Sequence, residues 1–119
     1  MRPLGVHHVS INVSDVAASL AFYTDVLGGV LRDDRPDFRF AGAWIDLGAQ
    51  QVHLIHAAVP PNNGQHFAIQ VGDLAAVVEE LRAKGLPVSD PFTINDDCQM
   101  NVEDPDGNLV ELHQVGRST

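Results

Sequence analysis

The chain has 119 residues, 45% of them apolar and 19% charged, which suits one compact domain and is too short for two ordinary ones. Sixteen acidic against seven basic side chains give a formal charge of −9, which would repel a phosphate backbone, so we expect no nucleic-acid partner. A single cysteine excludes an intrachain disulfide framework and favours a reducing compartment, which predicts a cytoplasmic protein. No apolar run is long enough for an export signal or a membrane span, so we expect no membrane partner.

The first predicted element is an alternating segment that recurs in the second half of the chain. Residues 8–18 read HVSINVSDVAA and residues 66–76 read HFAIQVGDLAA, a shift of 58 residues (66 − 8) with six of eleven positions identical. Apolar and polar residues alternate in both copies, which predicts a half-buried strand at the start of each. His8 and His66 fall on the polar faces of these strands.

A helix is predicted after each of the two strands. In the first half Ser14 or Asp15 is the candidate N-cap, and the helical spacing of apolar residues ends at Gly28. In the second half the same pattern runs from Asp73 to Gly85. We expect both helices to cover the apolar faces of their strands.

The rest of each half reads as short strands. They are predicted at residues 38–40, 43–47 and 51–56, and then at 88–91, 99–103 and 109–115. Arg32, Arg35 and Arg39 alternate with aspartates ahead of the first of these strands, which is more typical of a solvated loop than of an anion site.

These elements predict an α+β fold in which two βαβββ modules pair into a half-open mixed β-sheet cup with the helices outside. The whole chain, 1–119, is expected to be a single domain, with module one at 4–58, a linker at 57–65 and module two at 64–115. The linker reads AAVPPNNGQ, a composition typical of a connection rather than an element. Modules this small bury little surface alone, so we expect them to pair within the chain or across a homodimer.

Four side chains of metal-ligand type occupy positions that the repeat relates. The shift that superposes His8 on His66 also moves His53 onto Glu111 (111 − 53 = 58). A two-fold axis between the modules would bring all four to one point. Three imidazoles and a carboxylate suit a divalent ion such as Zn, Ni, Fe, Mn or Co, and rigid strands leave coordination positions open for water or substrate.

Further polar side chains share the faces of these four residues. Ser10, Asn12, Gln70 and His113 are expected to contact the substrate or to support the ligands. His113 is also a rival ligand, but its repeat equivalent is Ile55, which favours a supporting role beside Glu111.

Three motifs together resemble the vicinal oxygen chelate superfamily, the glyoxalase, bleomycin-resistance and extradiol-dioxygenase group. They read HHVSINVSDVAASLAFYTDVLG (residues 7–28), GQHFAIQVGDL (64–74) and DPDGNLVEL (104–112), and the resemblance covers Leu4 to Val115. It implies paired βαβββ modules, commonly in homodimers, with metal ligands on the first and last strands of each module. By this resemblance the ligands fall on His8, His53, His66 and Glu111, and the turn at 104–107 sets the register of Glu111.

The resemblance also implies a metal-dependent enzyme that acts on a small-molecule substrate. We expect a lyase or isomerase of the glyoxalase-like group that enolises or isomerises a small carbonyl compound, with Glu111 as the catalytic base. Glyoxalase I has a glutamate where His53 stands, so Glu111 would be the only carboxylate base.

Two other functions are compatible with the same residues. His8, His66 and Glu111 form the two-histidine, one-carboxylate set of Fe(II) extradiol-type dioxygenases and of some metal-dependent transferases. The chain could also be a non-catalytic small-molecule or antibiotic-binding protein. In that case Trp44 would form an apolar wall together with Phe38, Phe40 and Phe92.

Overall fold

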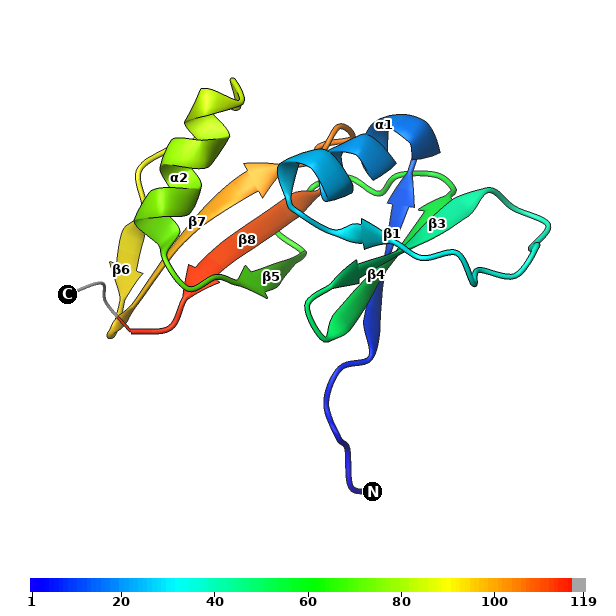
Figure 1. Cartoon of the computed structure of the whole chain (residues 1–119), viewed down its shortest axis with the longest axis horizontal. Coiled ribbons are helices and arrows are strands. Elements are labelled where there is room, and N and C mark those ends of the chain that lie inside the picture. Colours follow the sequence, from blue (N-terminus) through cyan, green and yellow to red (C-terminus); the bar gives the residue numbers. More distant parts are fainter. Residues whose placement is uncertain (117–119) are drawn as a thin grey trace. The chain divides into compact units, whose positions relative to one another are not determined.

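Two compact units make up the chain, and they divide after Pro61. We describe them from a computed structural model, which defines residues 1–116 (Figure 1). Module one is Met1–Pro61 and module two begins at Asn62. Each contains one four-stranded mixed sheet and one helical stretch, so the predicted α+β class with two βαβββ modules is confirmed. No helix within residues 1–116 is both long enough and apolar enough to cross a membrane.

Module one has its strands in the order β1-β4-β3-β2, with β1 parallel to β4 and the other pairs antiparallel. Its elements are β1 (His8–Val13), α1 (Val16–Ala21), a π-helical continuation η1 (Phe22–Val26), β2 (Val30–Leu31), β3 (Gly42–Leu47) and β4 (Gln50–His56). Of the two candidate caps, Asp15 is the one used, since its Oδ1 accepts a hydrogen bond from the Ala18 N–H at 3.1 Å. The helical stretch ends before Gly28, whose φ of 78° suits a glycine.

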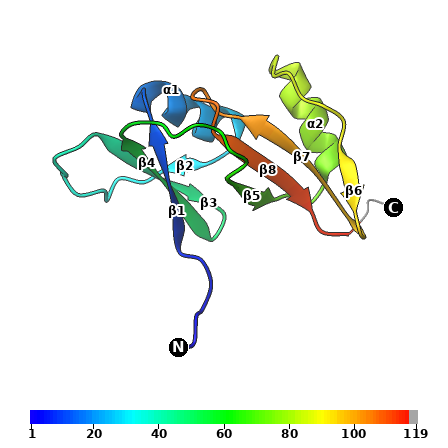
Figure 2. The ribbon, with the colours of Figure 1, turned by 180° about the vertical axis from the view of Figure 1, so that it is seen from behind.

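Module two repeats this plan in the order β5-β8-β7-β6, again with its first and last strands parallel (Figure 2). Its elements are β5 (His66–Gln70), α2 (Leu74–Ala83), β6 (Phe92–Ile94), β7 (Asp97–Glu103) and β8 (Leu109–Gln114). The Asp73 side chain caps α2, and the buried Gln114 accepts the Leu74 N–H at 2.8 Å. The start of the helix is therefore tied directly to the last strand.

Each helix covers one face of its own sheet, as predicted. In module one α1 contacts β3 and β4, and in module two α2 contacts β8. The core side chains between helix and sheet are Val13, Tyr23, Ile45, Val52 and Leu54 in module one, and Leu74, Val78, Leu81, Met100, Val110 and Leu112 in module two. The alternate residues of the strands, which include the candidate ligands, therefore lie on the other face.

The strand registers confirm the repeat. Ser10 lies beside His53 in the parallel pair of module one, and Ala68 lies beside Glu111 in that of module two, both related by the predicted shift of 58 residues. The hairpins differ, because Leu47 pairs with Gln50 across a two-residue link whereas Glu103 pairs with Leu109 across residues 104–108. As a result Trp44 lies opposite His53, while Asn101 lies opposite Glu111.

Two predicted strands are wrong. Residues 38–40 form a loop, and the strand that pairs with the outer side of β3 is instead β2 at Val30–Leu31. The strand predicted at 88–91 is instead β6 at Phe92–Ile94, since the flanking prolines supply no N–H for a ladder. Alternation alone does not show which sheet edge is available.

A buried carboxylate fixes the turn before β8. Asp104 is 5% exposed, and its Oδ1 accepts the N–H groups of Asp106 and Asn108 at 2.9 and 2.8 Å. Its Oδ2 accepts from the Asn108 side chain at 2.9 Å. The turn leads directly into β8, the strand that carries Glu111.

We expect Gly42→Ala to destabilise the fold by about 3 kcal/mol, because the new methyl group would overlap the Leu54 carbonyl oxygen on β4. The matched control is Gly72→Ala, where a Cβ meets nothing within 4 Å and the backbone needs no positive φ. Urea unfolding of both variants measures the difference. Equal free energies of unfolding for the two variants would contradict this expectation and would show that β3 and β4 can move apart to admit the methyl group.

Candidate functional site

Module one brings two of its candidate ligands together. The rings of His8 and His53 stack with centroids 4.0 Å apart and an interplanar angle of 15°. His53 also stacks on Trp44, at 4.5 Å and 11°. Since β4 lies between β1 and β3, His53 is the middle ring of the three. Stacking engages ring faces and leaves the nitrogen lone pairs, which lie in the ring plane, available to a ligand.

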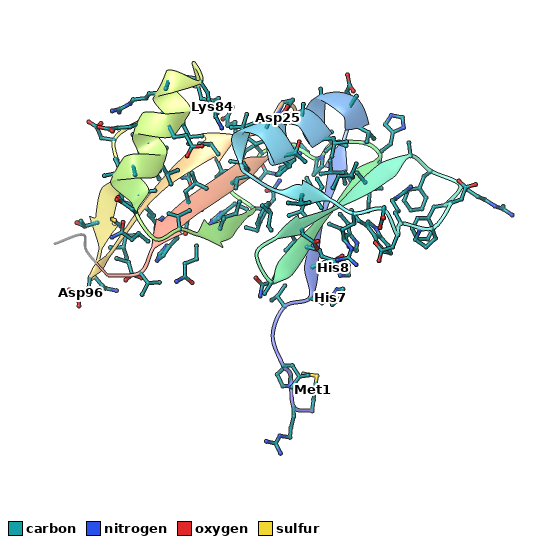
Figure 3. The ribbon with its side chains drawn as sticks, in the orientation of Figure 1. Met1, His7, His8, Asp25, Lys84 and Asp96 are labelled. Carbon is teal, nitrogen blue, oxygen red and sulfur yellow. The ribbon has the colours of Figure 1, made fainter. Side chains whose placement is uncertain are left out.

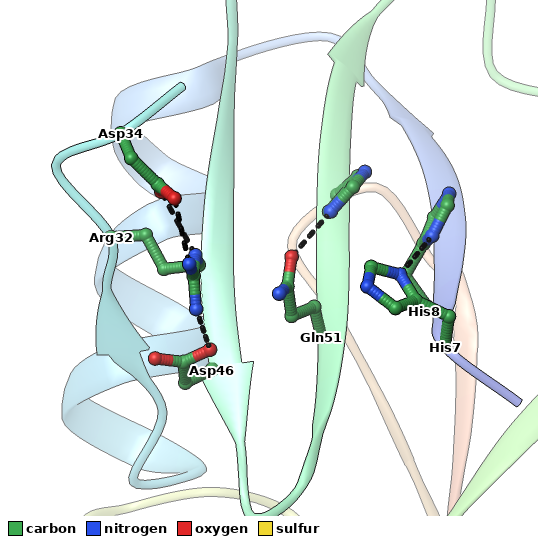
Figure 4. Close-up of polar contacts among 7 residues, drawn as sticks. His7, His8, Arg32, Asp34, Asp46 and Gln51 are labelled. Carbon is green, nitrogen blue, oxygen red and sulfur yellow. Dashed lines mark hydrogen bonds and ion pairs between the residues drawn. The ribbon is translucent and has the colours of Figure 1, made fainter.

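Hydrogen bonds orient both rings. Figure 3 shows His7 and His8 at the start of β1, and Figure 4 shows the 2.9 Å contact between their Nδ1 atoms. His53 Nε2 lies 2.8 Å from Gln51 Oε1; because that amide oxygen only accepts, the neutral ring carries its lone pair on Nδ1. Burial, followed by the nearby charge of a protonated His8, lowers the pKa of His53. Neutral imidazole is the form that binds metal.

Module two brings His66 and Glu111 together. His66 Nδ1 lies 2.8 Å from the Gly64 carbonyl oxygen, which only accepts, so Nδ1 carries the proton. His66 Nε2 lies 3.3 Å from Glu111 Oε1. In the neutral ring Nε2 has a lone pair, so two acceptors face each other there. Only a proton or a cation between them makes this arrangement favourable.

Glu111 is nearly buried, at 9% exposure, and neighbouring side chains hold both of its oxygens. Gln99 donates to Oε1 at 2.9 Å, and His113 Nδ1 lies 3.0 Å from Oε2. The other ring nitrogen of His113 lies 2.7 Å from Asp97 Oδ2, and Asp97 Oδ1 accepts the Gly116 N–H at 2.9 Å. The carboxylate is therefore fixed in one orientation.

Sequence reasoning placed His113 beside Glu111 but missed Gln99 and Asp97. Both lie on β7, where alternation puts every second residue on the same face as Glu111. The predicted strand began at residue 99, two residues after Asp97. Gln99 was inside the predicted strand, so alternation already pointed to it, whereas Asp97 needed the observed start of β7.

The pKa values of His113 and Asp97 shift in opposite directions. The hydrogen bond to Asp97, followed by that to Glu111, raises the pKa of His113 above its usual value. The backbone N–H of Gly116, followed by His113, lowers the pKa of Asp97. Each partner thus favours the charged form of the other.

Of the remaining predicted site residues, two lie beside candidate site histidines and one makes a structural hydrogen bond. Ser10 lies beside His53 in the strand register, and Gln70 lies beside His113. Asn12 donates to the Ala58 carbonyl at 2.9 Å, which ties β1 to the segment after β4. Arg32, which was expected in a solvated loop and not in a site, pairs with Asp34 and Asp46 at 2.7 and 2.9 Å (Figure 4).

Neither pair of candidate ligands is a complete metal site. Over residues 1–116, no group of three or more His, Cys, Asp or Glu side chains has a geometry that could hold a metal ion. Module one contributes two imidazoles, and module two contributes one imidazole and one carboxylate.

The His113–Asp97 pair gives a pH-dependent contribution to stability. Both groups are charged above the lowered carboxyl pKa and below the raised imidazole pKa, and their attraction is lost as pH rises through the pKa of His113. We expect Asp97→Asn to lower the free energy of unfolding more at about pH 5.5 than at about pH 9. Urea unfolding of the chelator-treated protein at both pH values tests this.

The control for this measurement is Asp90→Asn. Asp90 pairs with Arg82 at 2.8 Å on an exposed surface, and arginine stays protonated across this range. Its effect is expected to be the same at both pH values. An equal loss for Asp97→Asn at both pH values would show that the charge of His113 is not stabilised by Asp97.

Comparison with known proteins identifies the family. The model of the Glyoxalase/Bleomycin resistance protein/Dioxygenase superfamily matches residues 5–112. A Synechocystis protein named "Probable lactoylglutathione lyase" is 32% identical over 122 residues, covering 91% of this chain and 93% of that protein. An Arabidopsis thaliana protein named "Probable lactoylglutathione lyase, chloroplastic" is also 32% identical, but the chain spans only 35% of its length.

The fold comparison agrees with the sequence comparison. A crystal structure from Bacillus anthracis, of a protein named for the glyoxalase family, superposes with a TM-score of 0.87 at 25% identity, covering 98% of this chain and 100% of that one. Sequence motifs, strand order and family model point the same way. The chain belongs to the Glyoxalase/Bleomycin resistance protein/Dioxygenase superfamily.

Proposed function

We propose that the chain is a divalent-metal-dependent enzyme of the glyoxalase-like group that enolises or isomerises a small carbonyl compound. The observation that carries this proposal is the close approach of His66 Nε2 and Glu111 Oε1, at 3.3 Å, two atoms of the kinds that bind a divalent ion. A ligand histidine commonly donates its other ring N–H to a carbonyl, and His66 does so to Gly64. The relatives named lactoylglutathione lyase support the same class.

The donor set fits a catalytic ion. His8, His53, His66 and Glu111 supply nitrogen and oxygen donors and no thiolate, as suits Zn, Ni, Fe, Mn or Co. Two donors from each module make the four proposed ligands, drawn either from one chain or from two chains of a homodimer. When bound, such an ion polarises carbonyl oxygens and stabilises the negative charge of an enolised substrate.

We assign the proton transfer to Glu111, the one carboxylate among the four proposed ligands. In the proposed reaction its carboxylate removes a proton from the hydroxyl-bearing carbon next to the carbonyl and returns it to the former carbonyl carbon, while the hydroxyl proton passes to the former carbonyl oxygen. Gln99 and His113 hold the carboxylate in place between the two transfers. Since a histidine stands at the position of Glu111 in module one, a single carboxylate moves the proton in both directions.

We expect the purified protein to retain a divalent ion, and His66→Ala to weaken its binding by at least about tenfold. Elemental analysis after dialysis and calorimetric titration with Zn, Ni, Co and Mn measure this. The control is His56→Ala, an exposed imidazole at the end of β4 that is not among the proposed ligands. Equal affinities for both variants, or no ion in the wild type, would remove the metal site.

We expect Glu111→Gln to slow proton exchange on the substrate by at least about 100-fold, because an amide cannot accept the proton. The assay follows exchange with deuterated solvent by NMR, using the thiohemiacetal of methylglyoxal and glutathione. Glu103→Gln, on the exposed end of β7, is the matched control. Oxygen uptake with catechol and Fe(II), without proton exchange, would identify a dioxygenase instead.

A further inference from the structure

A run of aromatic rings leads away from the imidazole pair of module one. Beyond His53 come Trp44, at 4.5 Å, then Phe38, with its ring centroid 6.1 Å from Trp44, and Phe40, 5.2 Å from Phe38. We call Trp44, Phe38 and Phe40 the aromatic ladder. It begins on β3 and continues into the loop that precedes that strand.

The outer part of the ladder is exposed. Phe38 and Phe40 are 40% and 45% exposed although each carries a large apolar ring. Their planes are nearly parallel, at 8°, so the two rings stack on each other, and the exposed part of this loop is aromatic rather than aliphatic. An exposed apolar cluster of this kind commonly marks a binding surface.

The loop holds the rings in place. The Arg35 guanidinium lies 4.9 Å from the Phe38 ring centroid and 5.4 Å from that of Phe40. Its Nη2 donates to the Phe40 carbonyl at 2.9 Å, and it packs where a side chain at Gly42 would otherwise stand. A ligand would therefore meet an ordered surface and lose little affinity to the ordering of side chains.

The ladder is a feature of one module only. Trp44 lies opposite His53, whereas the residue opposite Glu111 on β7 is Asn101. The exposed Phe92 of module two stands on β6, a strand that pairs with β7 and not with the strand of Glu111. The modules share a fold but differ in the surface beside their candidate ligands.

We propose that the aromatic ladder is a subsite for a planar aromatic group of the substrate, so that the substrate is an aryl carbonyl compound. This rests on the proposed function, because the ladder leads to His53. Flat rings favour a flat occupant: offset stacking adds attraction beyond the apolar area buried, and a saturated ring cannot make it.

The test uses the single tryptophan of the chain as a reporter. In chelator-treated, ¹⁵N-labelled protein, acetophenone is titrated against its saturated counterpart, cyclohexyl methyl ketone, and the Trp44 indole N–H signal is followed by NMR. We expect saturable shifts with acetophenone and a Kd about fivefold lower than for the saturated ketone. Equal affinities, or no saturable shift of this signal, would overturn the proposal.

Substitutions locate the binding surface. Phe40→Leu and the double change Phe38→Leu with Phe40→Leu are expected to raise the acetophenone Kd by about fivefold, whereas Phe92→Leu, equally exposed in module two, leaves it within about twofold. An equal loss with Phe92→Leu would mean unspecific apolar binding and would contradict the proposal. The comparison of the two ketones on the wild type needs no substitution, so a folding failure does not decide it.

This experiment is independent of the metal. If acetophenone binds but elemental analysis finds no bound ion, the chain is a protein that binds aromatic compounds, and the proposed metal-dependent enzyme is contradicted. A bound ion without ring preference would leave the proposed enzyme, acting on a carbonyl compound that lacks an aromatic group.

Discussion

The parallel pairing of the first and last strands in each module is the constraint on which the rest of the structure depends. It brings together residues far apart in the chain, Ser10 with His53 and Ala68 with Glu111. A slip of one residue would exchange every buried side chain for an exposed one, so the apolar core opposes it. Packing of Val52 and Leu54 beneath α1 thus holds His53, the residue between them, on the opposite face.

The two modules use this frame for different chemistry. In module one imidazole rings stack with each other and with an indole, and burial favours their neutral form at His53. In module two a carboxylate is nearly buried and is held by a carboxamide and an imidazole. The cost of burying that charge is offset by the donors around it, as buried carboxylates require. The two copies of one fold therefore carry different side chains at related positions: stacked imidazoles in module one and a hydrogen-bonded carboxylate in module two.

The elements that could be predicted from sequence are those whose signals are local. Alternation indicated β1 and β5, polar caps indicated the two helices, and the repeat indicated that the two modules would share one strand plan. The loop at 38–40 and the strand β6 could not be predicted, because each depends on which sheet edge another segment already occupies. Asp97 was missed for a related reason: its partner His113 is reached only across the hairpin.

The unequal hairpins have a consequence for how the two halves are aligned. One offset relates β1 to β5 and β4 to β8, but β3 and β7 differ from it by one residue. If the halves descend from a duplicated ancestor, an insertion or deletion of one residue at the hairpin tip accounts for this difference. Because β7 still pairs with β8, the residues of β7 that lie opposite Glu111 and His113 share their face of the sheet. An ungapped superposition would match Trp44 with the buried Val102 and so confuse inward with outward positions; a gap at the tip restores the correspondence.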